Sequence, residues 1–216
     1  MSKFVVDWTA ALKPNKDILY TKSSHRSEFP CVHIYPDYLK IKFNSKIPEV
    51  EQVREFQSQW IDHETRSELH FITVEELPKN SVHIYVCCHA ARDERCGVIG
   101  RLLLSTLRDY INSPPRDIAD DLQHLDLQVF GCSHVGGHKY AGNMILYRPQ
   151  WRQGIWYGRI SPSNIDEIMR ETVVGQKVLG KHWRGGLPGG NWDPGNGISA
   201  EDAERLSRER RHCACP

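Results

Sequence analysis

The composition of this 216-residue chain is that of a globular protein with a hydrophobic core, since 39% of its residues are hydrophobic and 25% are charged. Its mean hydropathy of -0.53 excludes a mostly membrane-embedded chain, and no run approaches the roughly 18 apolar residues of a spanning helix. The formal net charge is +1, so the strong positive field typical of nucleic-acid-binding proteins is missing. We therefore expect no nucleic-acid partner and no membrane insertion.

The start of the chain does not resemble a secretory signal. Ser2 and Lys3 lead into a short apolar run that Asp7 interrupts, which is too short for a signal-peptide core and too acidic for a typical transit peptide. We expect an intracellular protein, cytoplasmic or mitochondrial. The cysteine count is seven, alongside eleven histidines, and an odd count without secretion favours metal ligation or redox chemistry over a disulfide framework.

Residues 1–80 contain few predicted elements. Alternating apolar residues over 31–43 predict one or two strands, with a break at Pro36 and Asp37. Apolar residues over 50–61 recur at helical spacing and predict an amphipathic helix of about 12 residues. Because two short strands and one helix bury little core, we interpret this as a smaller N-terminal α/β segment that forms part of a larger layer rather than an independent unit.

Residues 81–186 show a clearer alternation of elements. The order is strand, helix, strand, loop, strand, strand, helix, which is that of a thioredoxin-like fold: an α/β arrangement with a central mixed sheet flanked by helices. The pattern predicts strands at 82–86, 125–130, 144–147 and 155–160, and helices at 98–111 and from Ser163 through Val173.

The remaining residues, 187–216, differ in composition. Glycine and proline are frequent up to residue 197 and predict a flexible connector. A charged helix over 199–211 follows, with Ser199 as its expected N-cap, and such a helix is marginal on its own. Cys213 and Cys215 come after it, either as a redox-active pair or as inert thiols of a tail.

Two clusters of cysteine and histidine stand out, at 86–97 and 131–143. Each follows directly after a predicted strand. The loops after the strands of α/β sheets form the face where binding sites occur, so we expect these two loops to meet.

The clusters contain a pair of thiols and a pair of imidazoles. Cys87 and Cys96 have eight residues between them, and His134 and His138 have three, including the flexible Gly136 and Gly137. Two sulfur and two nitrogen donors suit a tetrahedral zinc site or a 2Fe-2S cluster with two histidine ligands. The spacing matches neither the usual structural zinc pattern nor the Rieske pattern, so both alternatives stay open.

Both clusters resemble the motifs of the sucrase/ferredoxin-like (Suc/Fer-like) family of thioredoxin-like ferredoxins, to which fungal actin-patches-distal and altered-inheritance-of-mitochondria proteins belong. Residues 87–97, C-C-H-A-A-R-D-E-R-C-G, are similar to the family's C-G-H-x-x-R-D-x-R-C-G. Residues 134–143, H-V-G-G-H-K-Y-A-G-N, are similar to its H-x-G-G-H-x-x-A-G-N, and residues 183–185 are similar to a closing W-R-G.

The resemblance implies a 2Fe-2S cluster bound through Cys87, Cys96, His134 and His138, with both histidines on the same iron. Cys88 stands where the family motif has glycine, so a spare thiol could replace Cys87. On this basis we expect an electron-transfer protein, with unknown donor and acceptor proteins, rather than an enzyme with its own substrate. The imidazole ligands would couple its potential to protons.

Two further functions compete with this one. A thiol oxidoreductase would use Cys88, or Cys213 and Cys215, and a zinc-binding module would use the same four donors as a structural site. Arg92 and Arg95 would either donate hydrogen bonds to a cluster or stiffen the loop with Asp93. Lys139, Tyr140 and Asn143 would orient His138 or cap a turn.

Overall fold

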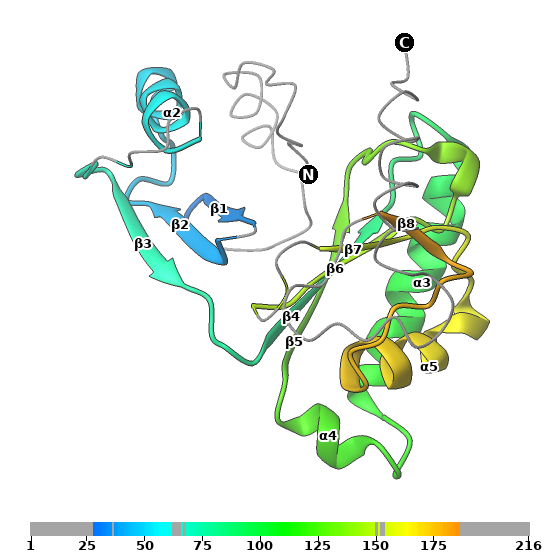
Figure 1. Ribbon diagram of the computed structural model, residues 1–216. Coiled ribbons are helices and arrows are strands. Elements are labelled where there is room, and N and C mark those ends of the chain that lie inside the picture. Colours follow the sequence, from blue (N-terminus) through cyan, green and yellow to red (C-terminus); the bar gives the residue numbers. More distant parts are fainter. Residues whose placement is uncertain are drawn as a thin grey trace. The chain divides into compact units, whose positions relative to one another are not determined.

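The computed structural model describes residues 28–35, 37–61, 66, 68–149, 151 and 154–185 (Figure 1). The chain divides into two compact units, Met1–Leu77 and Pro78–Pro216, and each is described by itself below. The predicted connector and helix over 187–216, with Cys213 and Cys215, lie outside the described residues.

The first unit contains a three-stranded antiparallel sheet in the order β1-β2-β3. The sequence prediction is confirmed for strands β1 (Cys31–Ile34) and β2 (Leu39–Phe43). It is also confirmed for helix α2 (Val50–Phe56), which continues as the π-helical turn η1 (Gln57–Ile61). Strand β3 (Ile72–Glu76) was not predicted. It is an edge strand whose residues are mostly exposed, so it lacks the apolar alternation that identifies a half-buried strand.

The first unit also has an apolar core of its own, so the prediction that it is only part of a larger layer is wrong. Phe43 of β2 and Phe56 of α2 meet edge to face, with ring centroids 5.5 Å apart. The segment before β3 adds further apolar side chains, which the count of regular elements did not include. The buried members are Ile41, Phe43, Val53, Phe56, Trp60, Leu69, Phe71 and Ile72.

The second unit has a five-stranded sheet in the order β5-β4-β6-β7-β8. Strands β4 and β5 are parallel, while β6, β7 and β8 follow on the other side of β4 in antiparallel pairs. This is the predicted thioredoxin-like arrangement, extended by β8, which the sequence did not predict as a strand. The strands are β4 (Ser81–Cys87), β5 (Asp126–Cys132), β6 (Met144–Tyr147), β7 (Ile155–Tyr157) and β8 (Trp183–Gly185).

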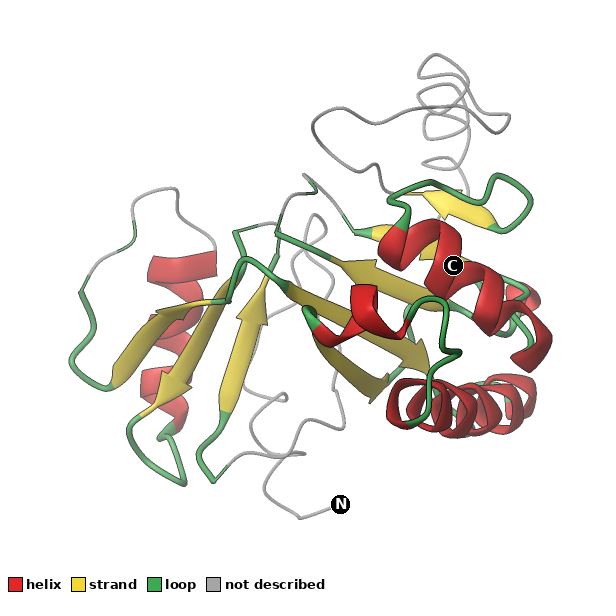
Figure 2. Cartoon of the chain, turned by 90° about the horizontal axis from the view of Figure 1, so that it is seen from below, coloured by secondary structure: helices red, strands yellow, loops and turns green. Residues whose placement is uncertain are grey.

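Helices α3 and α5 lie on the same side of this sheet (Figures 1 and 2). Helix α3 is the crossover between the parallel strands β4 and β5, and a short helix, α4, lies between α3 and β5. The last helical stretch consists of three short segments in succession. The bounds are α3 (Glu94–Asn112), α4 (Ala119–Gln123), η3 (Pro162–Asn164), α5 (Ile165–Glu167) and η4 (Ile168–Val174).

Two helix starts differ from the prediction because of capping. Helix α3 begins four residues before the predicted Val98, since the Asp93 carboxylate caps it by accepting a hydrogen bond from the Arg95 amide at 3.0 Å. The last helical stretch begins after Ser161 rather than Ser163. The Ser161 amide donates to the Asn164 side chain at 3.0 Å, which completes a capping box.

The two faces of β4 have different surroundings. Val82, Ile84 and Val86 belong to the core that also contains α3 residues such as Leu103. His83 and Tyr85 are also buried but point to the opposite face of the sheet, where the Tyr85 ring packs on Phe130 with centroids 5.1 Å apart. No helix in the described part of the chain is long and apolar enough to cross a membrane.

The contrast between neighbouring leucines of α3 tests this packing. Leu103 is fully buried in the core, so we expect Leu103→Ala to lower the free energy of unfolding by about 2–5 kcal/mol. Leu102 is 50% exposed on the same helix, so Leu102→Ala should change it by less than about 0.5 kcal/mol. Chemical denaturation followed by near-UV circular dichroism measures both, and equal losses would contradict the assigned helix face.

Candidate metal centre

The two motif loops begin side by side because β4 and β5 end together. Cys87 is paired with Cys132 in the parallel register, and the Cys88 amide donates a hydrogen bond to the Cys132 carbonyl at 2.9 Å. On the other side of β4, the Cys87 amide donates to the Asn143 carbonyl at 3.0 Å. The expectation that the two loops meet at one edge of the sheet is confirmed.

Cys87 and Cys96 are brought together although eight residues separate them. Both side chains are buried, and a hydrogen bond joins the two thiols. The first loop turns back at His89, whose carbonyl accepts the Asp93 amide at 3.2 Å. Cys96 then lies in the first turn of α3 rather than in the predicted loop, so the early helix start is what returns it to Cys87.

The environment of Cys96 favours the protonated thiol. Burial, followed by the neighbouring Cys87 thiol, raises the pKa of Cys96 to about 12. A metal would replace the protons on such a pair, because cysteine binds metals as the thiolate. Their ligation of a metal stays a prediction.

Cys88 lies on the other side of β4 from Cys87, because successive side chains alternate at the end of a strand. Its Sγ donates to the Val86 carbonyl at 3.3 Å and lies 2.7 Å from where a Cβ on Gly100 of α3 would be. This placement disfavours exchange of Cys88 for Cys87, which sequence alone left open.

The thiol of Cys88 is also poorly suited to attack a substrate. Burial, followed by Cys87, raises the pKa of Cys88 to about 11, while the charges of Arg101 and Arg108 act in the lowering direction. Few Cys88 side chains are therefore thiolates at neutral pH, and the thiolate is the reactive form.

The second loop turns through two glycines in the left-handed region, Gly136 with φ 81° and Gly137 with φ 62°. The His134 ring lies near His89 of the first loop, with centroids 6.0 Å apart. His89 Nδ1 is buried and has no hydrogen-bond partner among the described residues. His138 begins the short helix η2 (His138–Tyr140), and its side chain is outside the description.

Arg184 of β8 holds the second loop against the sheet. Its guanidinium donates to Asn143 Oδ1 and lies over the Tyr140 ring, 4.7 Å from the centroid. Buried Asn143 in turn donates to the Gly137 carbonyl at 3.2 Å. These contacts give Tyr140 and Asn143 a loop-stabilising role. The role of Arg184 was missed, and its only signal in the sequence was the resemblance to a closing W-R-G.

Arg95 also stabilises a loop. Its guanidinium makes two hydrogen bonds to the Asp93 carboxylate, at 3.0 and 2.8 Å. Of the two predicted roles for this residue, the structure supports loop stiffening. Arg92 is exposed.

The donor types brought together here fit a metal centre of mixed sulfur and nitrogen ligation. Two buried thiols touch, and the imidazole of His134 belongs to the adjoining loop beside an unpartnered His89 nitrogen. Within the described ranges, no three His, Cys, Asp or Glu side chains are gathered closely enough to hold a metal ion. Of the four predicted ligands, the structure therefore brings the two cysteines together. It places the His134 ring in the adjoining loop, and the side chain of His138 is outside the description.

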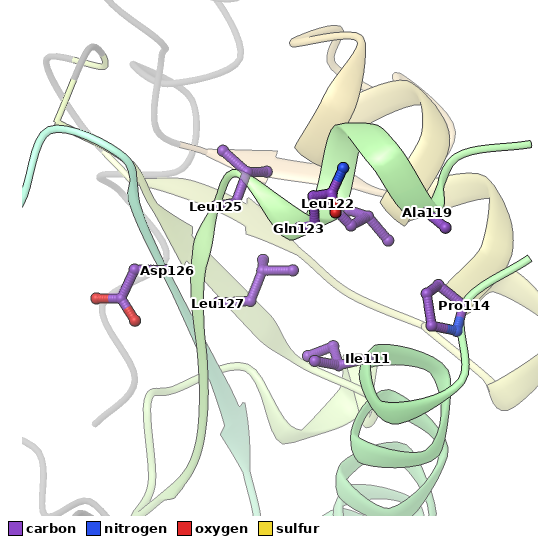
Figure 3. Close-up of a pocket in the computed structure, with 8 residues that line it drawn as sticks. All are labelled: Ile111, Pro114, Ala119, Leu122, Gln123, Leu125, Asp126 and Leu127. Atoms are coloured by element: carbon purple, nitrogen blue, oxygen red, sulfur yellow. The ribbon is translucent and has the colours of Figure 1, made fainter. Parts of the chain in front are cut away.

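A separate apolar pocket of about 360 Å³ lies at the other end of β5. Figure 3 shows Leu127 of β5, Leu122 of α4 and Ile111 of α3 among the side chains that line it. Since Asp126 starts β5 and Cys132 ends it, this pocket is distinct from the motif loops. Its lining residues are Ile111, Pro114, Ala119, Leu122, Gln123, Leu125, Asp126 and Leu127.

Comparison with known proteins gives both a family and relatives. The profile of the family described as sucrase/ferredoxin-like matches residues 6–185. The chain is 33% identical over 166 residues to altered inheritance of mitochondria protein 32 of Clavispora lusitaniae, covering 71% of this chain and 57% of that protein. It is 29% identical over 169 residues to the protein of the same name in Debaryomyces hansenii, covering 71% and 59%. The chain thus spans less than three fifths of these relatives.

A solved structure, the thioredoxin-like [2Fe-2S] ferredoxin from Aquifex aeolicus, is similar with a TM-score of 0.38 and 16% sequence identity. The similarity covers 54% of this chain and 97% of that protein.

Substitution of Arg184 tests the loop contacts. Arg184→Leu leaves buried Asn143 without its donor, so we expect the free energy of unfolding to fall by about 1–3 kcal/mol. Amide hydrogen exchange over 134–143 should rise. Arg159→Leu is the control, because Arg159 also lies over the Tyr140 ring at 5.2 Å but is exposed and should contribute no more than about 1 kcal/mol. Equal effects of the two variants would contradict a special role for Arg184.

Proposed function

This chain belongs to the sucrase/ferredoxin-like family, and we propose that its thioredoxin-like unit binds a 2Fe-2S cluster and transfers single electrons. The proposed ligands are Cys87, Cys96, His134 and His138. The observation that carries the proposal is the contact between the buried Cys87 and Cys96 thiols at the end of β4, next to the loop that bears both histidines.

The cluster, when bound, supplies a one-electron redox couple. Cys87 and Cys96 would contribute two thiolates, so binding releases their protons, including the one that burial holds on Cys96. Burial of both side chains limits access of water to the sulfur ligands. Arg184 and Asn143 would keep the histidine loop in position while the charge of the site changes.

A thiol oxidoreductase is the weaker alternative. The raised pKa values of Cys88 and Cys96, about 11 and about 12, leave little nucleophilic thiolate at neutral pH. Cys213 and Cys215 lie outside the described residues. A structural zinc site would use the same four donors, so chemical analysis of the bound metal must separate it from the cluster.

Partners and location are part of the same proposal. We infer unidentified electron donor and acceptor proteins, and a location in the mitochondrion or the cytoplasm. The names of the relatives, which refer to the inheritance of mitochondria, support that location.

Single cysteine variants test the sulfur ligands. Cys87→Ala and Cys96→Ala should abolish cluster binding, because each removes one of the two adjoining thiols. Cys88→Ala and Cys132→Ala are matched controls at the same strand ends, and both should retain the cluster. The measurements are the visible absorption spectrum of anaerobically purified protein and its content of iron and acid-labile sulfide.

Two results would contradict this ligand assignment. If Cys88→Ala loses the cluster and Cys87→Ala retains it, the ligand is Cys88 and not Cys87. Colourless native protein containing zinc instead of iron would replace the electron-transfer proposal with the zinc module.

The imidazole ligands are tested by the pH dependence of the midpoint potential. A histidine bound through one nitrogen keeps a proton on the other, and reduction, which adds negative charge, raises its pKa. Between the lower pKa of the oxidised state and the higher pKa of the reduced state, each electron brings a proton, so the potential falls as pH rises. One proton per electron gives a slope of about 59 mV per pH unit. Below both values the slope vanishes.

The control for this measurement is the double variant His134→Cys and His138→Cys. Two added thiolates should lower the potential and remove the slope, in the direction that distinguishes all-cysteine clusters from those with histidine ligands. Potentials measured from pH 6 to about 10 decide between the outcomes. A flat line for the native protein would refute proton coupling, and a slope that survives in the double variant would assign it to another group.

A further inference from the structure

His89 in the first motif loop has a buried ring nitrogen that makes no hydrogen bond. Its Nδ1 atom has no partner among the described residues. Buried polar atoms of side chains are nearly always hydrogen-bonded, so an exception points to a role that the other contacts do not reveal. The contacts that stiffen this loop run between Arg95 and Asp93 and do not use this nitrogen.

The backbone of the loop fixes where the His89 ring lies. The His89 carbonyl accepts hydrogen bonds from the Arg92 and Asp93 amides, at 3.3 and 3.2 Å. Ala90, the next residue, packs so closely on the first turn of α3 that a Cβ on Gly97 would overlap its side chain. The position of the imidazole is therefore set by the same turn that brings the two ligand thiols together.

The neighbour of this ring in the second loop is His134. The centroids of the two rings are 6.0 Å apart, and the ring planes are inclined by 43°. Val135, which follows His134, is only 5% exposed and anchors this end of the second loop in the protein. Since His134 is one of the proposed ligands, the unpartnered nitrogen belongs to a side chain that lies next to a ligand.

A histidine that binds a metal through one nitrogen needs a hydrogen-bond acceptor for the other. The second nitrogen carries a proton, and metal-binding histidines almost always donate it to an acceptor, which fixes the orientation of the ring. The carboxylates near the first loop are poorly suited, because Asp93 already accepts from Arg95 and Glu94 is exposed. An imidazole nitrogen without a proton is also an acceptor, so Nδ1 of His89 fits this role.

We propose that His89 is a positioning residue of the metal centre, whose Nδ1 accepts a hydrogen bond from the ring N–H of His134 when His134 binds the metal. The proton of His89 is then on its Nε2. This inference rests on the proposed function, in which His134 is a ligand. The hydrogen bond makes the His134 imidazole a more basic ligand, which favours the oxidised state of a cluster and lowers its midpoint potential. His89 itself neither binds the metal nor changes its redox state.

Three variants of the full chain test this role. His89→Leu removes the acceptor, whereas His89→Asn is the matched control, because an asparagine Oδ1 takes nearly the place of a histidine Nδ1 and also accepts hydrogen bonds. His124→Leu removes an exposed histidine before β5 and controls for the loss of any imidazole. Each protein is purified anaerobically with its cluster. The measurements are the midpoint potential at one fixed pH and the concentration of iron chelator that removes half of the iron.

We expect only His89→Leu to differ from the native protein. Its potential should be higher, and half of its iron should be lost at a chelator concentration about tenfold or more lower. His89→Asn and His124→Leu should keep both native values. After removal of the metal, His89→Leu should unfold at the same denaturant concentration as the native chain, because Nδ1 has no hydrogen bond to lose in that state.

Four results would overturn the inference. A native potential and native iron retention in His89→Leu would remove His89 from the centre, and equal effects of His89→Leu and His89→Asn would show that Nδ1 is not the acceptor. Complete loss of the cluster from both variants would make His89 a ligand. Equal destabilisation of His89→Leu with and without the metal would assign it a packing role only.

The failure of the proposed function gives a different result. If the native protein contains zinc and no cluster, the electron-transfer function is wrong, and the same variants then decide the role of His89 through their affinity for zinc. His89→Leu should bind zinc about tenfold or more weakly than the native protein and His89→Asn, and equal zinc affinities would overturn the inference. A native protein that binds neither the cluster nor zinc would overturn both proposals.

Discussion

The parallel pairing of β4 with β5 is the constraint on which the candidate site depends. It makes the two strands end together, with Cys87 opposite Cys132, so two loops that are distant in sequence start from adjacent points. The connection between parallel strands must cross the sheet, and α3 is that crossover. Its first turn therefore begins beside the end of β4. The same topology thus brings together Cys87, Cys96 and the loop that contains His134 and His138.

The thiols of the candidate site are buried, and burial opposes the loss of their protons that metal binding would require. Apolar surroundings favour neutral thiols, as the raised pKa of Cys96 indicates, whereas metal ligation requires thiolates. A bound metal ion compensates for this through its positive charge. The loops themselves are held by contacts that do not involve a metal, such as Arg95 with Asp93 and Arg184 with Asn143. Both loops therefore keep their shape through contacts within the protein alone.

Helix α3 performs different tasks on its two sides. The buried side carries Cys96 and core leucines, and Gly100 lets it approach the end of β4 closely. The exposed side carries Val98 and Leu102.

Local patterns in the sequence determined much of this architecture. The short apolar runs of β4 and β6, the helical periodicity of α3 and the order of elements predicted the thioredoxin-like sheet, because buried strands and half-buried helices leave these patterns in the sequence. Elements with weak periodicity were missed, including edge strand β3, short helix α4 and β8. The motifs also predicted that the 87–97 and 134–143 loops would meet, since parallel strands end on one face.

Only the tertiary structure decided which side chains in those loops touch. Cys87 and Cys88 are neighbours in the sequence, but strand alternation directs Cys87 toward Cys96 in the first turn of α3 and Cys88 toward Gly100 farther along the same helix. Arg184 reaches Asn143 across 41 positions of sequence, a contact that no local pattern encodes. The sequence by itself thus determined the donor types and their loops, because these follow from composition and periodicity. The pairing of individual atoms depended on how helix and strands pack in three dimensions.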